Sequence, residues 1–276
     1  MDKTRPQNAA KDNVQESLHL TNVNSPKALI SLLDNIHGLP TEPPSLFMDL
    51  ERINKANITF LCLFVPLKQA IYRIKIDGDR CPDLTTINES GESIKSILES
   101  ESIPKVIFDV RQLSNAIFRL HNVSLDGIRD LQLMELASRD IKHSKKYVAG
   151  LTKCVEQDIA SSNEARTRWL DTINVNDYRT FNTIGHAPRW SMKRVELFPA
   201  LWNTYHARLN RPAQAFWLAQ SVWEAKTRVA ASQYPKFNVE DKGNALGPEV
   251  WCDHEQREYA MENWNRDLSM GIKIGE

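Results

Sequence analysis

The spacing of apolar residues changes several times along the first half of the chain, and each change marks a predicted element. Continuous apolar runs bounded by polar connections predict buried strands, whereas apolar residues three and four positions apart predict helices. Strands are predicted at residues 46–51, 58–65, 70–76, 105–109 and 128–133. Helices are predicted at residues 26–36, 93–100 and 114–120.

The connections between the predicted strands indicate how the strands pair. Short turns join the runs at 46–51, 58–65 and 70–76, so these three are expected to form an antiparallel meander. Helices separate the later strands, and this alternation favours parallel pairing through right-handed crossovers. The sequence therefore predicts an α/β fold with a mixed five-stranded sheet and helices on its faces.

The remainder of the chain consists of a polar start and a helical second half. Residues 1–24 are polar and lack apolar periodicity, which predicts a disordered or loosely attached arm. Trp202, Trp217 and Trp223 lie on predicted helical faces, where core packing is expected and base stacking is the alternative. Helical spacing recurs in residues 147–159, 190–209, 213–231 and 254–270, with a loop at 233–250.

Composition limits the classes of function. The 276 residues include 35 basic and 35 acidic side chains, so there is no global attraction for nucleic acid, and binding would need a local patch. The four cysteines lie far apart without metal-site spacing, which is typical of structural thiols in a reducing compartment. No segment reaches membrane-spanning length. We therefore expect an intracellular protein, cytoplasmic or nuclear, with no membrane partner.

Two carboxylates stand out in the first predicted strand. Asp49 and Glu51 are two positions apart, and residues at this spacing point to the same face of a strand. Two like charges on a buried strand cost free energy unless a cation neutralises them, and a divalent metal ion is the usual cation. The alternative is an exposed strand end on which both acids are solvated.

The order of the elements and several blocks of sequence resemble the RNase D-like branch of the DEDD superfamily of 3′–5′ exonucleases. The resemblance covers about residues 26–232. It implies an RNase H-like three-layer α/β/α fold with a helical C-terminal extension. It also implies an exonuclease-like domain at 25–232, with a loop and C-terminal helix at 233–276 packed on it. The blocks are residues 45–51, 105–117 with 127–134, and 195–202, while 150–154 and 181–182 fit the fungal members.

In this family four carboxylates hold two divalent ions that activate water and stabilise the leaving oxygen, and a Tyr or His positions the water. Asp49 and Glu51 match the first pair of acids. The acid of the second motif falls at Leu113 and that of the third at Arg194, while the water-positioning residue falls at Trp190. The resemblance therefore implies a degenerate site in which only half of the metal ligands remain.

These substitutions oppose metal binding. Leu113 offers no oxygen, Trp190 has no acceptor for water, and a cation such as Arg194 repels a metal ion. The repulsion at 4 Å amounts to about 8 kcal/mol at an effective dielectric near 20. We therefore expect no cofactor, although Mg or Mn would be the cofactor of an active site at Asp49 and Glu51. Arg194 is expected to pair with one of these acids, the alternative being an exposed helix position.

Nearby acids and bases complete the candidate residues. Asp109, Asp130 and Glu196 lie near the motifs but are not expected to rebuild a metal site. Basic residues at helical spacing suggest either a phosphate-binding face or ordinary solvated helices. The candidates for nucleic-acid binding are Arg139, Lys142, Lys146 and Lys153, with Lys193 in a second basic group.

Three functions follow from these observations. The first is a catalytically inactive exonuclease-like domain that acts as a nucleic-acid-binding or protein-assembly module, with RNA, another single-stranded nucleic acid, a protein or a second copy as partner. The second is an active metal-dependent exonuclease with a rearranged ligand set. The third is a protein-interaction scaffold that does not bind nucleic acid.

Overall fold

A mixed β-sheet forms the centre of the protein, which a computed structural model describes at residues 18–53, 58–79, 81–140, 142–174 and 188–270. The strand order is β1-β4-β3-β2-β5-β6. β2, β3 and β4 pair antiparallel, and β5 and β6 continue from β2 in parallel, so the predicted mixed pairing is confirmed. The strands are β1 (His19–Val23), β2 (Leu46–Ile53), β3 (Ile58–Val65), β4 (Ala70–Lys75), β5 (Lys105–Ile107) and β6 (Ile128–Asp130).

The sheet has six strands and not the predicted five, because His19–Val23 adds β1 at one edge. β1 runs parallel to β4, with His19 opposite Ala70. Only Val23 of its five side chains is buried, so the strand lacks the apolar run by which buried strands are predicted. The prediction of a loosely attached arm is therefore wrong for His19–Val23, while residues 1–17 lie outside the described part of the chain.

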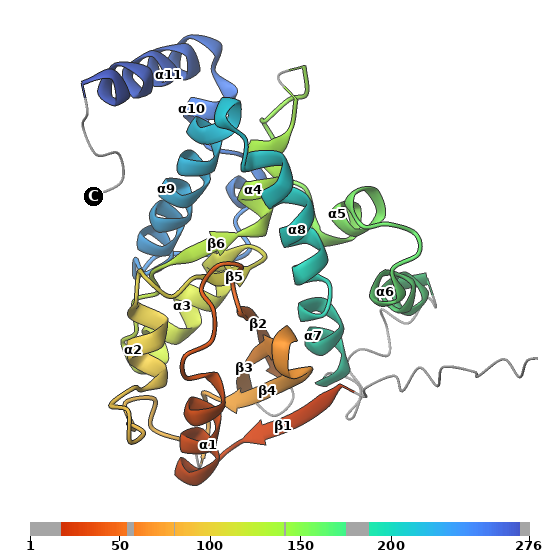
Figure 1. The fold of residues 1–276 in the computed structure, drawn as a ribbon, viewed down its shortest axis with the longest axis vertical. Coiled ribbons are helices and arrows are strands. Elements are labelled where there is room, and N and C mark those ends of the chain that lie inside the picture. The colour runs from red at the N-terminus through yellow and green to blue at the C-terminus, as the bar shows by residue number, and fades with distance from the viewer. Residues whose placement is uncertain (1–17, 54–57, 80, 141, 175–187, 271–276) are drawn as a thin grey trace, which may run out of the picture.

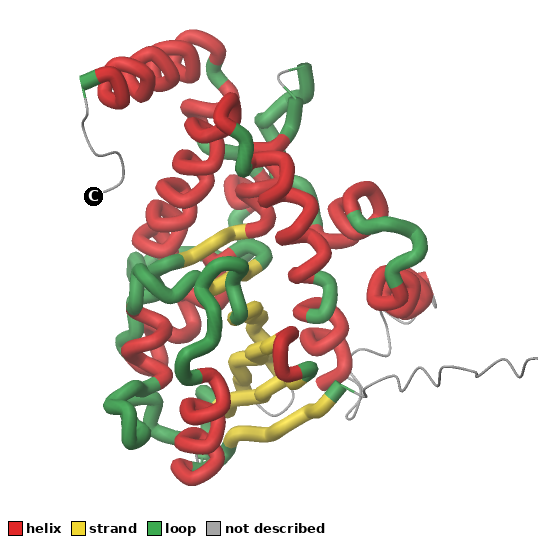
Figure 2. Tube along the Cα trace, viewed as in Figure 1, coloured by secondary structure: helices red, strands yellow, loops and turns green. Residues whose placement is uncertain are grey.

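Helices cover both faces of the sheet. Figure 1 shows α3 (Val110–His121) and α7 (Pro188–Val195) on opposite sides of the central strands, and Figure 2 shows the same layers as red helices around yellow strands. α3 packs on β2, and α7 packs on β2 and β3. The other helices are α1 (Pro26–Ile36), α2 (Ile94–Glu99), α4 (Leu131–Ser138), α5 (Leu151–Asp158), α6 (Glu164–Asn174), α8 (Phe198–Leu209), α9 (Ala215–Ser232), α10 (Glu249–Cys252) and α11 (His254–Ser269).

β5 and β6 are shorter than predicted because an acid caps the helix that follows each one. β5 ends two residues before Asp109, whose carboxylate accepts a hydrogen bond from the Arg111 backbone N–H at 3.4 Å. β6 ends at Asp130, whose carboxylate accepts from the Gln132 backbone N–H at 3.0 Å. Residues 131–133, predicted as strand, are therefore the first turn of a helix.

The second half of the chain is helical, as predicted, but two details differ. α4 ends at Ser138 and α5 begins at Leu151, so the predicted helical spacing of basic residues from 139 to 153 does not form one face. Trp202 and Trp217 are buried as predicted, whereas Trp223 is 63% exposed, so the prediction that it packs in the core is wrong. Among the described helices none is long and apolar enough to cross a membrane.

Candidate functional site

Asp49 and Glu51 lie on the central strand β2 beneath α7. The two side chains share one face of the sheet because of the two-residue period of a strand. They are 5% and 4% exposed, so the alternative of two solvated acids is wrong. Two carboxylates buried this close to each other require compensating positive charge or hydrogen bonds.

Arg73 of β4 neutralises Glu51 with a two-point contact. Its Nε donates to Glu51 Oε2 at 2.6 Å and its Nη2 donates to Glu51 Oε1 at 3.0 Å. The guanidinium also lies 3.6 Å above the centre of the Phe60 ring, and its Nη1 donates to Asn22 Oδ1 at 3.3 Å. Both oxygens of Glu51 are therefore occupied by a protein cation held on several sides.

Arg194 of α7 lies against Asp49. Arg194 Nε and Asp49 Oδ2 are 3.3 Å apart, which is the pairing that the sequence predicts. Both atoms are buried, and neither makes a hydrogen bond within the described part of the chain. The contact is therefore an ion pair without the alignment of a hydrogen bond, which makes it weaker than the two-point contact at Glu51.

The environment of Asp49 disfavours its charged form. Burial raises the pKa of Asp49 to about 6, although the nearby Arg194 guanidinium acts in the opposite direction.

Cys62 lies beside the two acids, with Sγ 3.5 Å from Glu51 Oε2 and 3.3 Å from Ser191 Oγ. Burial raises the pKa of the Cys62 thiol, so this cysteine is a structural thiol and not a nucleophile.

The residues around Asp49 and Glu51 do not fit a pair of divalent ions. Leu113 of α3 is 2% exposed and supplies only an aliphatic surface to the site. Arg194 stands beside one acid and Arg73 occupies the other. In the described ranges no group of three or more His, Cys, Asp or Glu residues is placed to hold a metal ion. The side chain of Trp190 lies outside the described part of the chain.

The other nearby acids already have partners. Asp109 receives Arg111 Nε and Nη2 at 2.7 Å each, and these charges hold its pKa below the usual range despite burial, which raises it. Asp130 pairs with Arg228 at 2.8 Å. Glu196 pairs with Arg168, with an N–O distance of 2.9 Å. These acids are held in ion pairs of their own, which is consistent with the expectation that they do not rebuild a metal site.

A cavity of about 220 Å³ opens beside Asp49 and Arg194. Its polar side also includes Asp109 and Arg111, and Leu113 forms part of its apolar side. The C-terminal segment, which was predicted only as a loop, contributes Phe237, Val239 and Asn244 to a further wall. This cavity is therefore lined in part by α3 and α7 and by a segment more than 100 residues farther along the chain from α3.

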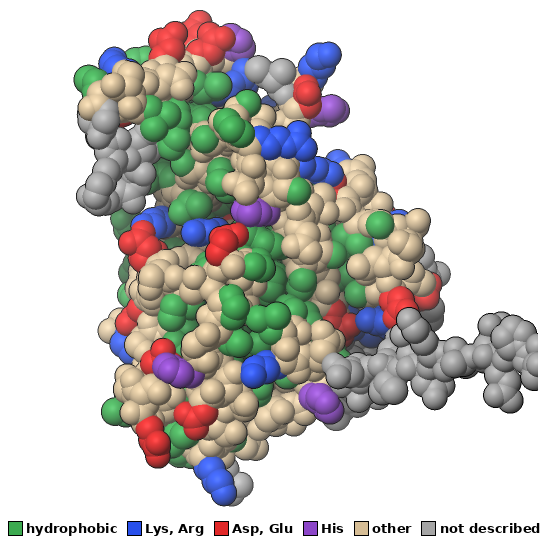
Figure 3. Space-filling view, viewed as in Figure 1, with side chains coloured by type: hydrophobic (Ala, Val, Ile, Leu, Met, Phe, Trp, Pro, Cys, Tyr) green, Lys and Arg blue, Asp and Glu red, His purple; other side chains and the backbone are tan. Residues whose placement is uncertain are grey.

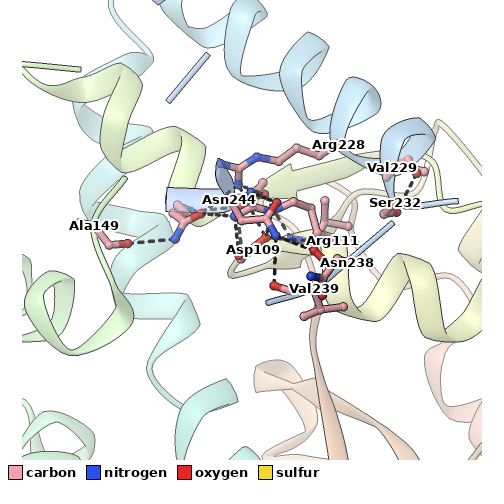
Figure 4. A network of polar contacts seen from close by, with 12 residues as sticks. Asp109, Arg111, Ala149, Arg228, Val229, Ser232, Asn238, Val239 and Asn244 are labelled. Carbon is pink, nitrogen blue, oxygen red and sulfur yellow. Dashed lines mark hydrogen bonds and ion pairs between the residues drawn. The ribbon is translucent and has the colours of Figure 1, made fainter. Parts of the chain in front are cut away.

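Sequence reasoning missed the arginines that organise this region. Figure 4 shows Arg111 and Arg228 converging on Asp109, with Asn244 next to Arg111. Arg228 Nη1 also donates to Gln132 Oε1 at 3.0 Å. The sequence does indicate a buried ion pair at Arg73, because a charged residue inside an apolar strand requires a buried partner. The sequence gives no such indication for Arg228, because helical spacing alone does not distinguish a buried arginine from a solvated one.

The predicted nucleic-acid-binding residues do not form one surface. Arg139 is engaged internally, because it pairs with Glu135 at 2.6 Å and donates to the Ser144 and Tyr147 carbonyls. Lys193 donates to Thr172 Oγ1 at 2.6 Å and is half-buried. On the face drawn in Figure 3, basic and acidic side chains are interspersed among the coloured residues. The exposed candidates are Lys142, Lys146 and Lys153.

Comparisons with known proteins identify the fold. No protein-family model matches the chain, and no curated protein matches it in sequence. The structure of Trypanosoma brucei RNase D in complex with GMP matches with a TM-score of 0.59 and 14% identity, covering 88% of this chain and 72% of that one. The same enzyme in complex with RNA U12 matches with a TM-score of 0.58 and 15% identity, covering 84% and 77%.

A third structure of Trypanosoma brucei RNase D also matches, with a TM-score of 0.58 and 15% identity over 88% of this chain and 82% of that chain. At this level of identity the similarity establishes a shared fold. The chain therefore has the RNase H-like α/β architecture of these exonucleases, as predicted, with the sixth strand β1 as the difference from the expected sheet.

Proposed function

We propose that this chain is an exonuclease-fold domain that has lost two-metal cleavage and serves as a binding module for RNA or another single-stranded nucleic acid. The observation that carries the first part is the pairing of Asp49 with Arg194 and of Glu51 with Arg73. A metal ion at this site would have to displace two guanidinium groups and would find Leu113 in place of a third ligand.

Binding of nucleic acid is supported by the loop between α4 and α5. Lys142 and Lys146 are exposed there, and Lys153 follows on the outer side of α5. Tyr147 is 56% exposed, and Lys146 Nζ lies 5.5 Å from the centre of its ring. Exposed aromatic rings beside lysines suit single strands, because the ring stacks on a base while the lysines contact phosphates.

Protein assembly is the second candidate, as a homodimer or with another protein. Trp223 on α9 is 63% exposed, and exposed tryptophan is typical of binding surfaces. An interaction scaffold of this kind would need no affinity for nucleic acid. Salt-dependent retention of RNA separates the two candidates, because phosphate contacts weaken steeply with salt and apolar contacts do not.

Cleavage is tested with a single-stranded RNA labelled at its 5′ end, so that trimming from the 3′ end is visible as a ladder. The purified chain is expected to leave the RNA intact at every concentration of magnesium or manganese. A ladder that grows with manganese and disappears in Asp49→Asn would establish the alternative, an active exonuclease with a rearranged set of ligands.

Binding is tested by fluorescence anisotropy of the same RNA over a range of salt concentrations. In the triple variant Lys142→Ala, Lys146→Ala and Lys153→Ala, the slope of log affinity against log salt should become shallower by about 2, for three lost phosphate contacts. The matched control replaces the exposed Lys27, in α1, and the exposed Lys68, between β3 and β4, with alanine. RNA affinity that is equal in both variants would reject this surface.

A further inference from the structure

Residues 233–247 run from the end of α9 past the cavity to the loop between α4 and α5. Their side chains are sorted by exposure. Phe237, Val239 and Asn244 are half-buried and line the cavity, whereas Asn238 and Lys242 are exposed. This pattern shows that the segment has an inner and an outer side, although its sequence has no regular period.

The first end of the segment is held by α3. Asn115 Nδ2 donates to the Ser232 carbonyl at 2.8 Å, and both side chains are buried. Arg119, one turn after Asn115 on the same helix, donates from its Nη2 to the Pro235 carbonyl at 2.9 Å. The segment therefore leaves α9 in a direction set by the helix that also carries Leu113.

The middle of the segment is held by Asn244. Its Oδ1 accepts from Arg111 Nη1 at 3.1 Å, and its Nδ2 donates to the Asn238 and Val239 carbonyls at 3.0 Å each. Figure 4 shows these groups together beside Asp109. One side chain thus shapes the turn of the segment and ties it to an arginine of the cavity wall.

The far end of the segment pairs with the loop that carries the exposed lysines. The Gly247 backbone N–H donates to the Lys146 carbonyl at 2.9 Å, and the Val148 backbone N–H donates to the Ala245 carbonyl at 3.0 Å. A Cβ atom at Gly247 would lie 2.2 Å from the Lys145 carbonyl oxygen. Only glycine allows this approach, because the obstacle is backbone and cannot rotate away.

We infer that residues 233–247 form a strap that closes one side of this cavity and can open locally without unfolding of the domain. A polymer that approached Asp49 from the side of the strap would have to displace Phe237 and Val239. The strap is held mainly by hydrogen bonds at three points and buries little apolar surface, which is typical of segments that open below the global free energy of unfolding. The closure does not depend on whether the domain binds nucleic acid.

The test measures access to the cavity with a thiol introduced by Leu113→Cys, at the cavity wall. Its alkylation by iodoacetamide is followed by peptide mass spectrometry, and the buried native Cys154 reports global unfolding in the same sample. Adding Gly247→Ala should raise the alkylation rate at position 113 by about tenfold or more, because the strap loses its far anchor. The rate at Cys154 should not change.

The matched control is Gly150→Ala, because a Cβ atom at Gly150 meets nothing within 4 Å. It should leave both alkylation rates unchanged. Should Gly247→Ala fail to fold, Asn244→Ala removes the middle anchor and is expected to act in the same direction. Two results would contradict the proposal that residues 233–247 form a strap over the cavity. One is rapid alkylation at position 113 before any anchor is removed. The other is an unchanged rate in a folded variant whose amides at 237–246 exchange freely.

Discussion

The two acids of β2 are each paired with an arginine, but the two pairs are built differently. Glu51 is held by Arg73 through two short hydrogen bonds, and Arg73 is itself fixed by Phe60. Asp49 and Arg194 approach to 3.3 Å without a hydrogen bond. Arg73 comes from within the sheet, where strand register sets its position, whereas Arg194 comes from a helix laid across the sheet.

This difference indicates that the pair of Glu51 and Arg73 is structural, whereas the pair of Asp49 and Arg194 lies where the resemblance expects a metal ligand in place of Arg194. The pair at Glu51 has the geometry of a permanent part of the core, because each donor of its fork meets an acceptor. The pair at Asp49 keeps a buried carboxylate whose partner neutralises it incompletely. We therefore expect variants at the two pairs to differ in size of effect and in dependence on pH.

The largest effect is expected from Arg73→Met, which leaves Glu51 buried without its cation. Loss of one partner of a buried pair costs about 3 to 5 kcal/mol, and urea unfolding at pH 7 measures this loss. The control is the double variant Arg73→Met with Glu51→Gln, which removes the charge as well and should recover most of the stability. A double variant as unstable as the single one would show that Arg73 acts through packing on Phe60.

The second prediction concerns the contribution of Asp49 to the pH dependence of the free energy of unfolding. The pKa of Asp49 is about 6 in the folded protein against 3.8 for the ordinary group, so the folded state binds the proton more tightly. The free energy of unfolding should therefore fall as pH rises from about 4 to 6, by about 3 kcal/mol in the contribution of this group.

Asp49→Asn should remove that fall, and a series of urea unfolding curves from pH 4 to pH 8 measures it. Asp171→Asn, at an exposed carboxylate on α6, is the matched control and should keep the parental profile. A profile that Asp49→Asn leaves unchanged would contradict the raised pKa of Asp49.

The smallest effect is expected from Arg194→Met, because this arginine is partly exposed and its contact is poorly aligned. It should cost about 1 kcal/mol at pH 8 and almost nothing at pH 5, where Asp49 is mostly protonated. It should also move the titration of Asp49, followed by carbon NMR of the carboxyl group, above a pKa of about 6. Arg194→Lys keeps the charge and should shift the titration less. An unmoved titration would mean that the two groups do not interact.

Much of the sheet could be predicted because its strands carry continuous apolar runs. The run at 58–65 coincides with β3, and the change from a meander to crossovers gave the correct pairing. β1 escaped prediction because it is an edge strand with exposed side chains, for which no apolar pattern is required. The same limitation applies to the basic residues after Ser138, where a break between helices left no trace in their spacing.

At the site, the pairing of Asp49 with Arg194 could be predicted because the lost acid and the gained cation fall at one aligned position. The sequence indicated that Arg73 needs a buried partner but not that this partner is Glu51, because Arg73 lies on a different strand and reaches Glu51 only through the register of the sheet. The strap could not be predicted either. Its course depends on single hydrogen bonds from Asn115, Arg119 and Arg111, which leave no periodic signal.

The edge strand β1 has a practical consequence for work on fragments. Asn22 of β1 supplies the third contact of the Arg73 guanidinium, so this outer strand reaches as far as the carboxylate layer. A fragment cut at residue 25, where the predicted exonuclease-like domain starts, would discard this contact and expose the edge of β4. The smallest faithful fragment for biochemical assays therefore begins before His19.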